Sequence, residues 1–286
     1  MTHQTTSPPP RRTPRTWFIT GTSSGFGRLL TEQLVARGDR VAATLRNIAA
    51  LDDLRARVDR DRLWVRALDV TDTAAVRRVV DEAFAALGRI DIVANNAGYG
   101  LFGAAEEVTD EQIRDQLATN VVGSIQVIRA ALPHLRAQGG GRILQVSSEG
   151  GQISYPGFGL YHASKWAIEG FCETVAQEVA SFGIGMTIVE PGPTRTNFGA
   201  GLVKPAPMAA YDHTPVAAMR DLTGFQLRGD PAKMARAMID SVERTPAPLR
   251  LALGSSAYAS IRGALTRRLA DLEANRPITL ATDVDP

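Results

Sequence analysis

The sequence predicts an α/β fold, with one doubly wound parallel sheet of about seven strands flanked by helices. Two observations support this prediction: short apolar runs alternate with longer amphipathic stretches from residue 16 onward, and glycine or polar residues separate them. Such alternation is typical of βαβ units, in which helices cover both faces of the sheet. With 286 residues, 44% of them hydrophobic, the chain is long enough to bury the core of such a domain.

Seven mostly apolar runs have the length of buried strands, and seven longer stretches have the hydrophobic period of helices. The predicted strands are residues 17–20, 41–45, 63–68, 90–94, 143–146, 186–189 and 249–253. The predicted helices are residues 26–37, 48–59, 73–87, 110–136, 158–181, 231–244 and 256–275. Boundary residues agree, since Asp72 precedes one helix, Gly88 ends it, and Asp230-Pro231 opens another.

The alternation breaks between residues 194 and 229, where prolines, glycines and scattered aromatic residues replace it. An irregular insert of this length in a compact domain is usually functional, so we expect a lid here. The expected organisation is a leader at 1–15, one domain at 16–255 that includes the lid, and a helical C-terminal extension and tail at 256–286.

Charge is concentrated at one end of the chain. The formal net charge is +2, but Arg11, Arg12 and Arg15 supply +3, so the remainder carries −1. These arginines lie in a Pro/Ser/Thr-rich segment that cannot bury enough apolar surface to order itself. We therefore expect a disordered basic leader over 1–15 and no nucleic-acid partner. No run approaches the roughly 18 apolar residues of a membrane span, and no signal-peptide core is present.

Cys172 is the only cysteine, which excludes an intramolecular disulfide and a cysteine zinc cluster. This composition suits a reducing compartment, so we expect a cytoplasmic protein. Metal-ligand spacing is absent, so no metal is expected.

A glycine-rich turn follows the first predicted strand, where Gly21, Gly25 and Gly27 form a G-x-x-x-G-x-G pattern before a helix. Glycines permit a tight turn and a close approach of the backbone to a diphosphate, and the helix N-terminus offers unpaired N–H groups. A simple turn is the alternative interpretation. The position between a strand and a helix favours a dinucleotide site.

Tyr161 and Lys165 form a Y-x-x-x-K pair at the start of a predicted helix, and their spacing places both side chains on one face. A phenol can donate the proton that carbonyl reduction requires, although free tyrosine has a pKa near 10. A neighbouring ammonium favours the phenolate, so Lys165 is expected to lower this pKa. An ordinary helix pair is the alternative, but lysine is rare in this chain, which otherwise uses arginine for its cations.

These motifs resemble those of the classical short-chain dehydrogenase/reductase family, and the resemblance covers about residues 16–255. Supporting motifs are Leu68-Asp69-Val70, Asn95-Asn96-Ala97-Gly98 and Pro191-Gly192-Pro193-Thr194-Arg195-Thr196. The resemblance implies a Rossmann-type fold that binds a nicotinamide dinucleotide. The expected cofactor-binding residues are Gly21, Ser23, Ser24, Gly25, Phe26, Gly27, Arg46, Asp69, Val70, Asn95, Ala97, Gly98, Tyr161, Lys165, Pro191, Gly192, Thr194 and Thr196.

The resemblance also implies a catalytic tetrad of Asn120, Ser148, Tyr161 and Lys165. Ser148 lies thirteen residues before Tyr161, as the family's serine does, and this spacing decides against Ser147. Ser148 would hydrogen-bond the substrate oxygen, Tyr161 would act as general acid/base, and Lys165 would also hold the nicotinamide ribose. Asn120 would interrupt its helix locally and hold a water that links Lys165 to solvent.

The end of the second predicted strand indicates which cofactor is preferred. Enzymes that prefer NAD usually place an acidic residue there for the ribose 2′-OH, whereas this chain has Leu45 followed by Arg46. A guanidinium pairs with a 2′-phosphate through charge-assisted hydrogen bonds. We therefore predict NADP(H) over NAD(H), with Ser24 and Arg46 at the phosphate; a solvated surface arginine is the alternative.

Within the family, the sequence is most similar to the branch of 17β-hydroxysteroid dehydrogenase type 1 and the retinol dehydrogenases, through residues 43–46, 96–101 and 168–173. That branch acts on bulky apolar carbonyls or the matching alcohols, and the apolar residues of the insert suit such a substrate. The expected substrate-pocket residues are Glu149, Tyr155, Phe158, Phe198, Leu202 and Tyr211, with Met208, Met219 and Phe225 as further apolar candidates.

The predicted function is NADP(H)-dependent oxidation and reduction of small hydrophobic ketones, aldehydes or secondary alcohols. Two alternatives stay open: a non-catalytic dinucleotide-sensing regulator, and a sugar-nucleotide epimerase or dehydratase that shares Y-x-x-x-K. His162 would point to a different helix face from Tyr161, so a structural or solvent-facing role is expected, and Cys172 is expected to pack in the core. The resemblance implies a homodimer or homotetramer paired through the helices at 110–136 and 158–181.

Overall fold

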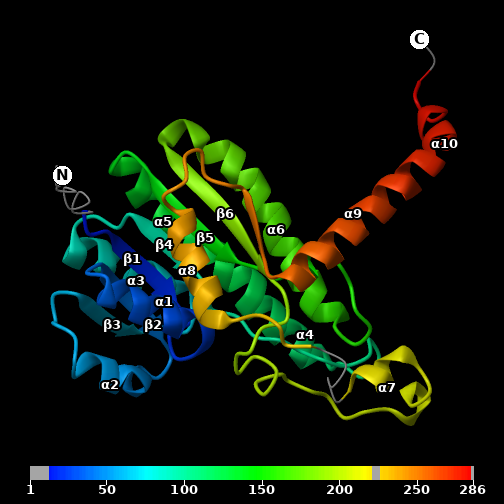
Figure 1. Cartoon of the computed structure of the whole chain (residues 1–286), viewed down its shortest axis with the longest axis horizontal. Helices are drawn as coiled ribbons and strands as arrows, with labels where there is room; N and C mark the ends of the chain where they lie inside the picture. Colours follow the sequence, from blue (N-terminus) through cyan, green and yellow to red (C-terminus); the bar gives the residue numbers. More distant parts are fainter. Residues whose placement is uncertain (1–12, 221–225, 285–286) are drawn as a thin grey trace, which may run out of the picture.

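The fold is a seven-stranded parallel sheet, seen in a computed structural model that describes residues 13–220 and 226–284 (Figure 1). The strand order is β3-β2-β1-β4-β5-β6-β7, so the chain reverses its direction of progress across the sheet between β1 and β4. The strands are β1 Thr16–Thr20, β2 Arg40–Leu45, β3 Leu63–Ala67, β4 Ile92–Asn95, β5 Gly141–Val146, β6 Ile184–Pro191 and β7 Arg250–Leu253. The predicted fold class is confirmed.

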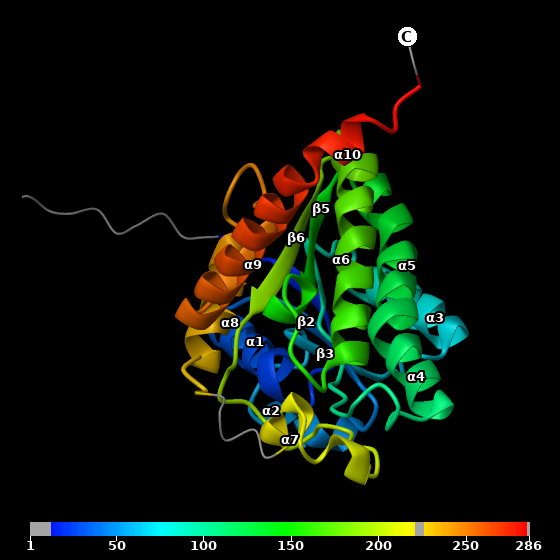
Figure 2. The same cartoon turned by 90° about the vertical axis from the view of Figure 1, so that its right-hand side faces the viewer.

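Helices cover both faces of the sheet (Figure 2). One face carries α3 Thr73–Leu87, α4 Asp110–Leu117, α5 Ser124–Ala137 and α6 Gly159–Val179, and the other carries α1 Gly25–Ala36 and α8 Pro231–Ser241. Strand side chains alternate between the two cores: Phe18 packs in the α3–α5–α6 core, whereas Trp17 and Ile19 pack in the α1–α8 core. Because both faces are buried, the strands read as continuous apolar runs.

Capping residues set several helix ends where the sequence predicts them. The Asp72 carboxylate accepts a hydrogen bond from the Ala75 N–H at 2.9 Å, and Gly88 ends α3 with a φ of +76°. The Asp230 carboxylate accepts from the Ala232 and Lys233 N–H groups, with Pro231 at the first position of α8. These caps satisfy backbone N–H groups that a helix cannot pair internally.

One predicted helix differs from the structure, and a second contains the local interruption that was expected at Asn120. The stretch 48–59 forms only a 3₁₀ turn, Ile48–Leu51, and the single turn α2 Asp52–Arg55. After Leu54 the stretch offers only the exposed Ala56 and the half-buried Val58 before a charged segment, so a longer helix would bury little. The stretch 110–136 divides into α4 and α5 around a π-helical turn, Ala118–Gly123, which contains Asn120.

The described part of the insert, residues 194–220 and 226–229, is irregular, with a 3₁₀ turn at Ala209–Tyr211 and one short helix, α7 Pro215–Met219. The Glu107 carboxylate anchors it by accepting hydrogen bonds from the Met208 N–H at 2.8 Å and from the Arg220 guanidinium at 3.0 Å. These bonds, with that from the Ala104 N–H, hold the pKa of Glu107 below its usual value. The insert is therefore fixed to the body at this point.

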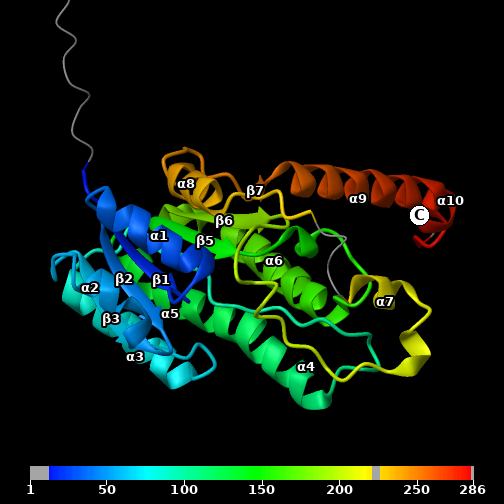
Figure 3. The ribbon, with the colours of Figure 1, turned by 60° about the horizontal axis from the view of Figure 1, so that its bottom comes forward.

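The chain ends in α9 Ser255–Ala274 and α10 Arg276–Leu280, which run away from the body (Figures 1 and 3). Cys172 is buried in the α6 core, where burial raises the pKa of its thiol to about 12. Across residues 13–220 and 226–284, no helix combines the length and apolarity needed to cross a bilayer.

Candidate active site

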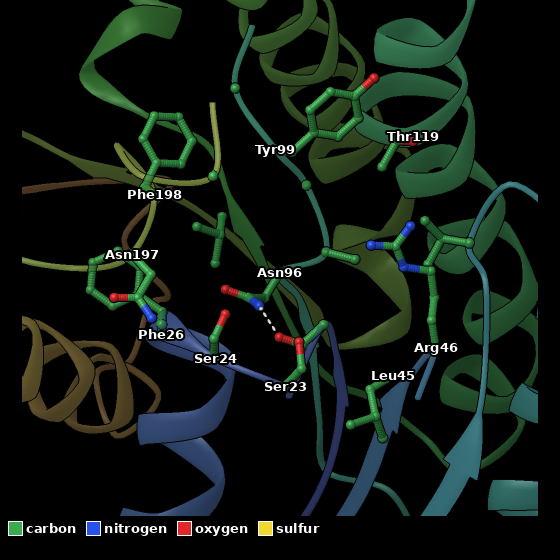
Figure 4. A pocket seen from close by; sticks show the side chains of 18 of the residues that line it. Ser23, Ser24, Phe26, Leu45, Arg46, Asn96, Tyr99, Thr119, Asn197 and Phe198 are labelled. Atoms are coloured by element: carbon green, nitrogen blue, oxygen red, sulfur yellow. Dashed lines mark hydrogen bonds between the residues drawn. The ribbon is translucent and has the colours of Figure 1, made fainter. Parts of the chain in front are cut away.

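The carboxyl ends of the strands open onto a cavity of about 790 Å³ (Figure 4). Residues directly after β1, β2, β3 and β4 line it, because parallel strands bring their carboxyl ends to one edge of the sheet. The cavity lies at the reversal of strand order between β1 and β4, where doubly wound sheets bind their ligands. Among its lining residues are Gly21, Ser23, Ser24, Gly25, Phe26, Arg46, Asp69, Val70, Ala97, Gly98, Tyr161, Lys165 and Thr196.

The glycine-rich turn between β1 and α1 is built for close backbone approach. A side chain at Gly21, which has a φ of +70°, would bring its Cβ within 2.8 Å of the Ala97 Cα. A Cβ on Gly27 would lie 2.3 Å from the Gly21 carbonyl oxygen, so Gly27 allows α1 to pack closely against the turn. Gly27 itself does not line the cavity. Ser24 is the N-cap of α1 without a side-chain capping bond, which leaves first-turn N–H groups available to an anion.

Polar side chains surround this turn. Arg46 lines the cavity together with Ser23 and Ser24 (Figure 4). The Asp69 carboxylate accepts hydrogen bonds from the Thr71 N–H at 2.9 Å and hydroxyl at 2.8 Å, which, with the nearby Arg46 charge, hold its pKa below the usual value. The cavity thus offers a cation, uncapped N–H groups and a carboxylate, a donor and acceptor set that fits a phosphorylated dinucleotide.

The two asparagines of the β4 motif have different positions. Asn95 is buried within the sheet, where its amide nitrogen donates to the Gln145 side chain at 2.8 Å and the Ser124 carbonyl at 2.9 Å. Asn96 lines the cavity instead, and its amide donates to the Thr20 and Gly21 carbonyls. The sequence prediction of Asn95 as a cofactor-binding side chain is therefore wrong: successive residues of a strand point to opposite sides, and Asn96 is the one that faces the cavity.

Tyr161 and Lys165 occupy the first turns of α6, and both are buried. The Lys165 ammonium lies 5.7 Å from the centre of the Tyr161 ring and donates to the Val146 carbonyl at 3.1 Å. Burial lowers the pKa of Lys165 to about 8 and raises that of Tyr161 to about 12. In the absence of a bound cofactor, the phenol is therefore protonated at neutral pH.

Ser148 lies beside Tyr161 at the start of the 3₁₀ turn Glu149–Gly151. Its hydrogen bond to Tyr161 opposes the effect of burial on the phenol pKa, and its hydroxyl oxygen accepts from the Gly150 N–H at 3.0 Å. Ser147 is engaged elsewhere, because its hydroxyl donates to the Glu169 carboxylate at 2.6 Å. Of the two serines, Ser148 is the one bonded to Tyr161.

Asn120 lies in the π-helical turn between α4 and α5. Its amide nitrogen donates to the Tyr99 carbonyl at 2.9 Å and the Ser164 hydroxyl at 3.1 Å, and its oxygen accepts from the Tyr99 N–H. A Cβ on Gly98 would lie 3.1 Å from the Asn120 oxygen and 3.8 Å from the Lys165 nitrogen. Gly98 thus separates Asn120 from Lys165 by little more than its own backbone.

A second cavity, of about 520 Å³, adjoins the first and has mostly apolar walls. Five of the six predicted substrate residues line it, namely Glu149, Tyr155, Phe158, Phe198 and Leu202, together with Pro191, Gly192, Thr194 and Thr196 from the β6 motif. Tyr211 lies outside it, where its hydroxyl donates to Glu106 at 2.7 Å. Met208 and Met219 do not line it either, and Phe225 lies outside the described residues.

His162 lines this second cavity, although the sequence assigned it only a structural or solvent-facing role. Its Nδ1 accepts the Tyr155 N–H at 3.2 Å, and burial lowers its pKa to about 4, so the ring is neutral at pH 7. Phe158 lies against the same ring at a centroid distance of 5.9 Å. His162 therefore has the expected structural role. It also lines the cavity, because α6 begins at the cavity wall and both Tyr161 and His162 lie in its first turn.

Glu149 and Tyr155 add polar groups to this apolar wall. The Tyr155 hydroxyl donates to one Glu149 carboxylate oxygen at 3.0 Å, while the other oxygen is buried without a hydrogen-bond partner. Burial raises the pKa of Glu149 above its usual value. This carboxyl is therefore the least satisfied polar group of the cavity wall.

An ionic cluster of Glu169, Glu173, Glu190 and Arg250, in which Glu169 and Glu190 are buried, supports the segment that carries Ser148. Arg250 on β7 donates to Glu169 at 2.6 Å, to Glu173 at 2.8 Å and to Glu190. Glu169 in turn accepts from the Ser147 hydroxyl at 2.6 Å and the Gln152 amide at 2.5 Å. Burial and the Glu169 charge raise the pKa of Glu190 to about 7. No sequence motif indicated this cluster, because its members come from α6, β6 and β7.

The two cavities meet at Tyr161. Ser147, Tyr161, Thr196 and Phe198 line both, and the Phe198 ring centre lies 5.4 Å from that of Tyr161. A proton donor with a neighbouring cation thus stands between a polar cavity that fits a dinucleotide and an apolar cavity that fits a small organic molecule. This arrangement suits proton transfer coupled to a reaction between the two ligands.

Comparisons of the sequence and the fold with known proteins identify the family. The sequence profile of the short chain dehydrogenase family matches residues 15–206. The oxidoreductase BOA17 of Botryotinia fuckeliana is 39% identical over 245 residues, covering 84% of this chain and 89% of that protein. A 3-ketodihydrosphingosine reductase of Bacteroides thetaiotaomicron is 37% identical over 185 residues, covering 65% of this chain and 66% of that protein.

A crystal structure of a short-chain dehydrogenase from Streptomyces avermitilis matches with a TM-score of 0.89 and 42% identity. The match covers 95% of this chain and 100% of that chain, so both the sheet and the flanking helices are shared. The family profile, the sequence relatives and this structure therefore agree. The chain is an oxidoreductase of the short-chain dehydrogenase family, whose members bind a nicotinamide dinucleotide.

Proposed function

We propose that this protein is an NADP(H)-dependent oxidoreductase that interconverts a hydrophobic ketone or aldehyde and the matching alcohol, with Tyr161 as general acid/base. The observation that supports this most is the position of Tyr161, which lines both the polar and the apolar cavity. The catalytic tetrad is Asn120, Ser148, Tyr161 and Lys165.

The cofactor would lie against the glycine-rich turn and α1. Gly21, Ser23 and Gly25 would contact the diphosphate, and Asp69 the adenine side. Ser24 and Arg46 would hold a 2′-phosphate, because Arg46 supplies a cation where an NAD-preferring site has an acid. When bound, the nicotinamide supplies or accepts the hydride.

Tyr161 would deliver the proton. Its buried phenol is protonated at neutral pH, which is the form that can donate to the oxygen of a carbonyl substrate. Ser148 would hydrogen-bond the same oxygen, since its hydroxyl already bonds to Tyr161. Lys165 would stabilise the resulting phenolate by its charge. Asn120 would keep Lys165 in place through the Gly98–Tyr99 segment.

The substrate would be apolar. The second cavity is walled by Phe158, Phe198 and Leu202, with few polar groups, and such a wall selects by burial of hydrocarbon surface. One relative is a 3-ketodihydrosphingosine reductase, a name that denotes a ketone substrate, which supports a hydrophobic ketone for this chain as well.

Absorbance of NADPH in the presence of apolar ketones of increasing size tests the proposal. We expect turnover with at least one bulky ketone and little with small polar carbonyls, because only the former fill the apolar cavity. Tight NADPH binding without turnover of any carbonyl or alcohol would instead favour a dinucleotide-sensing regulator. Conversion of a nucleotide sugar would favour an epimerase or dehydratase.

Replacing Arg46 with alanine should reduce the preference for NADPH over NADH by on the order of 10- to 100-fold in kcat/KM, because the charge-assisted bonds to the 2′-phosphate are lost. NADH kinetics should change little. Arg78→Ala serves as the matched control, since Arg78 is exposed on α3 and does not line the cavity. An unchanged preference in the Arg46 variant would refute the assignment.

A further inference from the structure

Helix α9 and the short α10 expose an apolar face. Six large apolar side chains in this part of the chain are more than half exposed: Tyr258, Leu265, Leu269, Leu272, Ile278 and Leu280. Spacings of seven, four and three residues place the first four of these on one side of α9. Single exposed leucines are ordinary on protein surfaces, but a stripe of this length on one helix marks an interaction surface.

The body contacts only the first part of α9. Ala257, Ile261 and Ala264 pack against Ile153 and Tyr155, and the Arg268 guanidinium lies 4.9 Å from the Trp166 ring. Every residue from 269 to 280 is exposed, and α9 runs away from the sheet in Figures 1 and 3. A helical segment this short is marginal alone in water, so a partner that covers the stripe would stabilise it.

Two opposite charges on one flank of the stripe, those of Arg262 and Glu273, indicate which partner would fit it. Arg262 and Glu273 are exposed and eleven residues apart, close to three full turns, so both lie on the same flank of the stripe. Neither forms an ion pair within residues 13–220 and 226–284. In an antiparallel pair of identical helices, equivalent flanks face each other, so Arg262 of each copy meets the Glu273 of the other.

We propose that α9 is a docking surface for α9 of a second copy of this chain, packed antiparallel about a two-fold axis between residues 267 and 268. This register brings Leu265 and Leu269 of both copies together at the axis and forms two symmetric Arg262–Glu273 pairs. In this two-fold arrangement a single partner covers the apolar stripe and also pairs the charges that flank it. The contact is separate from the α4–α5 and α6 faces through which the family resemblance implies pairing.

Cross-linking of the full chain at single engineered cysteines tests the contact directly. Thr266 lies near the two-fold axis, on the same flank of the stripe as Arg262. The next residue, Arg267, points away from the stripe, to the opposite side of the helix. A bis-maleimide spanning about 10 Å, the separation of packed helix axes, should join Thr266→Cys chains in high yield and Arg267→Cys chains poorly. The unmodified chain is a further control, because its only cysteine, Cys172, is buried.

Charge exchange tests the register. Arg262→Glu or Glu273→Arg alone places like charges opposite each other, so the Thr266→Cys cross-link should fall several-fold. The double exchange Arg262→Glu/Glu273→Arg should restore it. Leu265→Glu/Leu269→Glu should abolish it, with the thermal midpoint and ketone turnover used to verify that each variant is folded.

Three results would overturn the proposal. Equal yields from Thr266→Cys and Arg267→Cys would mean random encounter. Failure of the double exchange to restore cross-linking would refute the antiparallel register. Cosedimentation with vesicles of anionic phospholipid that depends on Leu265 and Leu269, without the cross-link, would show that the stripe binds a lipid surface instead.

Discussion

Replacing Tyr161 with phenylalanine is expected to lower turnover by on the order of 10²- to 10⁴-fold, while the affinity for NADPH changes little. The substitution removes only the hydroxyl that would donate the proton and keeps the ring that packs against Phe158 and Phe198. Steady-state kinetics with the best ketone, and NADPH fluorescence for binding, measure the two quantities. The loss should therefore appear in kcat rather than in cofactor affinity.

The matched control is Tyr155→Phe, which removes the other phenol of the apolar cavity. The Tyr155 hydroxyl bonds to Glu149 and would not transfer a proton, so we expect a change in KM larger than that in kcat. A Tyr161→Phe variant with turnover within a few-fold of the wild type would contradict the proposed mechanism. So would a larger loss of kcat in the Tyr155 variant.

The pH dependence follows from the same groups. Alcohol oxidation needs the phenolate as base, and because the phenol pKa lies above neutrality, the oxidative rate should rise with pH. Ketone reduction needs the protonated phenol and the Lys165 ammonium, so it should fall as pH passes about 8, where Lys165 loses its proton. Opposite slopes in the two directions are the expected result, and the rise of the oxidative rate with pH should be absent from Tyr161→Phe.

Arg250→Leu should destabilise the fold by about 3 kcal/mol at pH 8, because it leaves Glu169 and Glu190 buried beside each other without their cation. The cost should shrink near pH 5. Glu190 has a folded pKa of about 7, above its unfolded value, so its protonated form is favoured in the folded state and stability is lost as pH rises. Denaturant unfolding at both pH values measures the difference.

Arg55→Leu is the matched control, since Arg55 pairs with Asp52 at the surface of α2 and should contribute less than about 0.5 kcal/mol. Adding Glu190→Gln to Arg250→Leu should recover part of the loss at pH 8, because one buried negative charge is removed. If Arg250→Leu costs no more than Arg55→Leu, or costs the same at pH 5 and pH 8, the cluster does not carry the stability assigned to it.

Local rules in the sequence predicted much of this protein. The positions of the strands follow from apolar runs, and the ends of α3 and α8 follow from Asp72, Gly88 and Asp230, since capping depends only on nearby residues. The sequence also predicted that Tyr161 and Lys165 share one helix face and that the glycine-rich turn follows β1. Both features line the same cavity. Each of these signals lies within a few residues, where helix and strand geometry are fixed by the chain itself.

The tertiary structure decided what depends on residues far apart in the chain. Asn96 rather than Asn95 faces the cofactor cavity, because the orientation of β4 against β1 and β5 sets which side chain points outward. His162 reaches the apolar cavity, whereas Tyr211 lies outside it, where it bonds to Glu106.

The Glu169–Arg250 cluster and the exposed stripe of α9 also depend on contacts between residues that are far apart in the chain. The cluster exists because β7 pairs with β6 beside α6, which brings Arg250 to carboxylates 60 to 81 residues away in sequence. The stripe is exposed because α9 leaves the body after Arg268. Hydrophobic period reveals that a face is apolar, but only the assembled fold shows whether anything covers it.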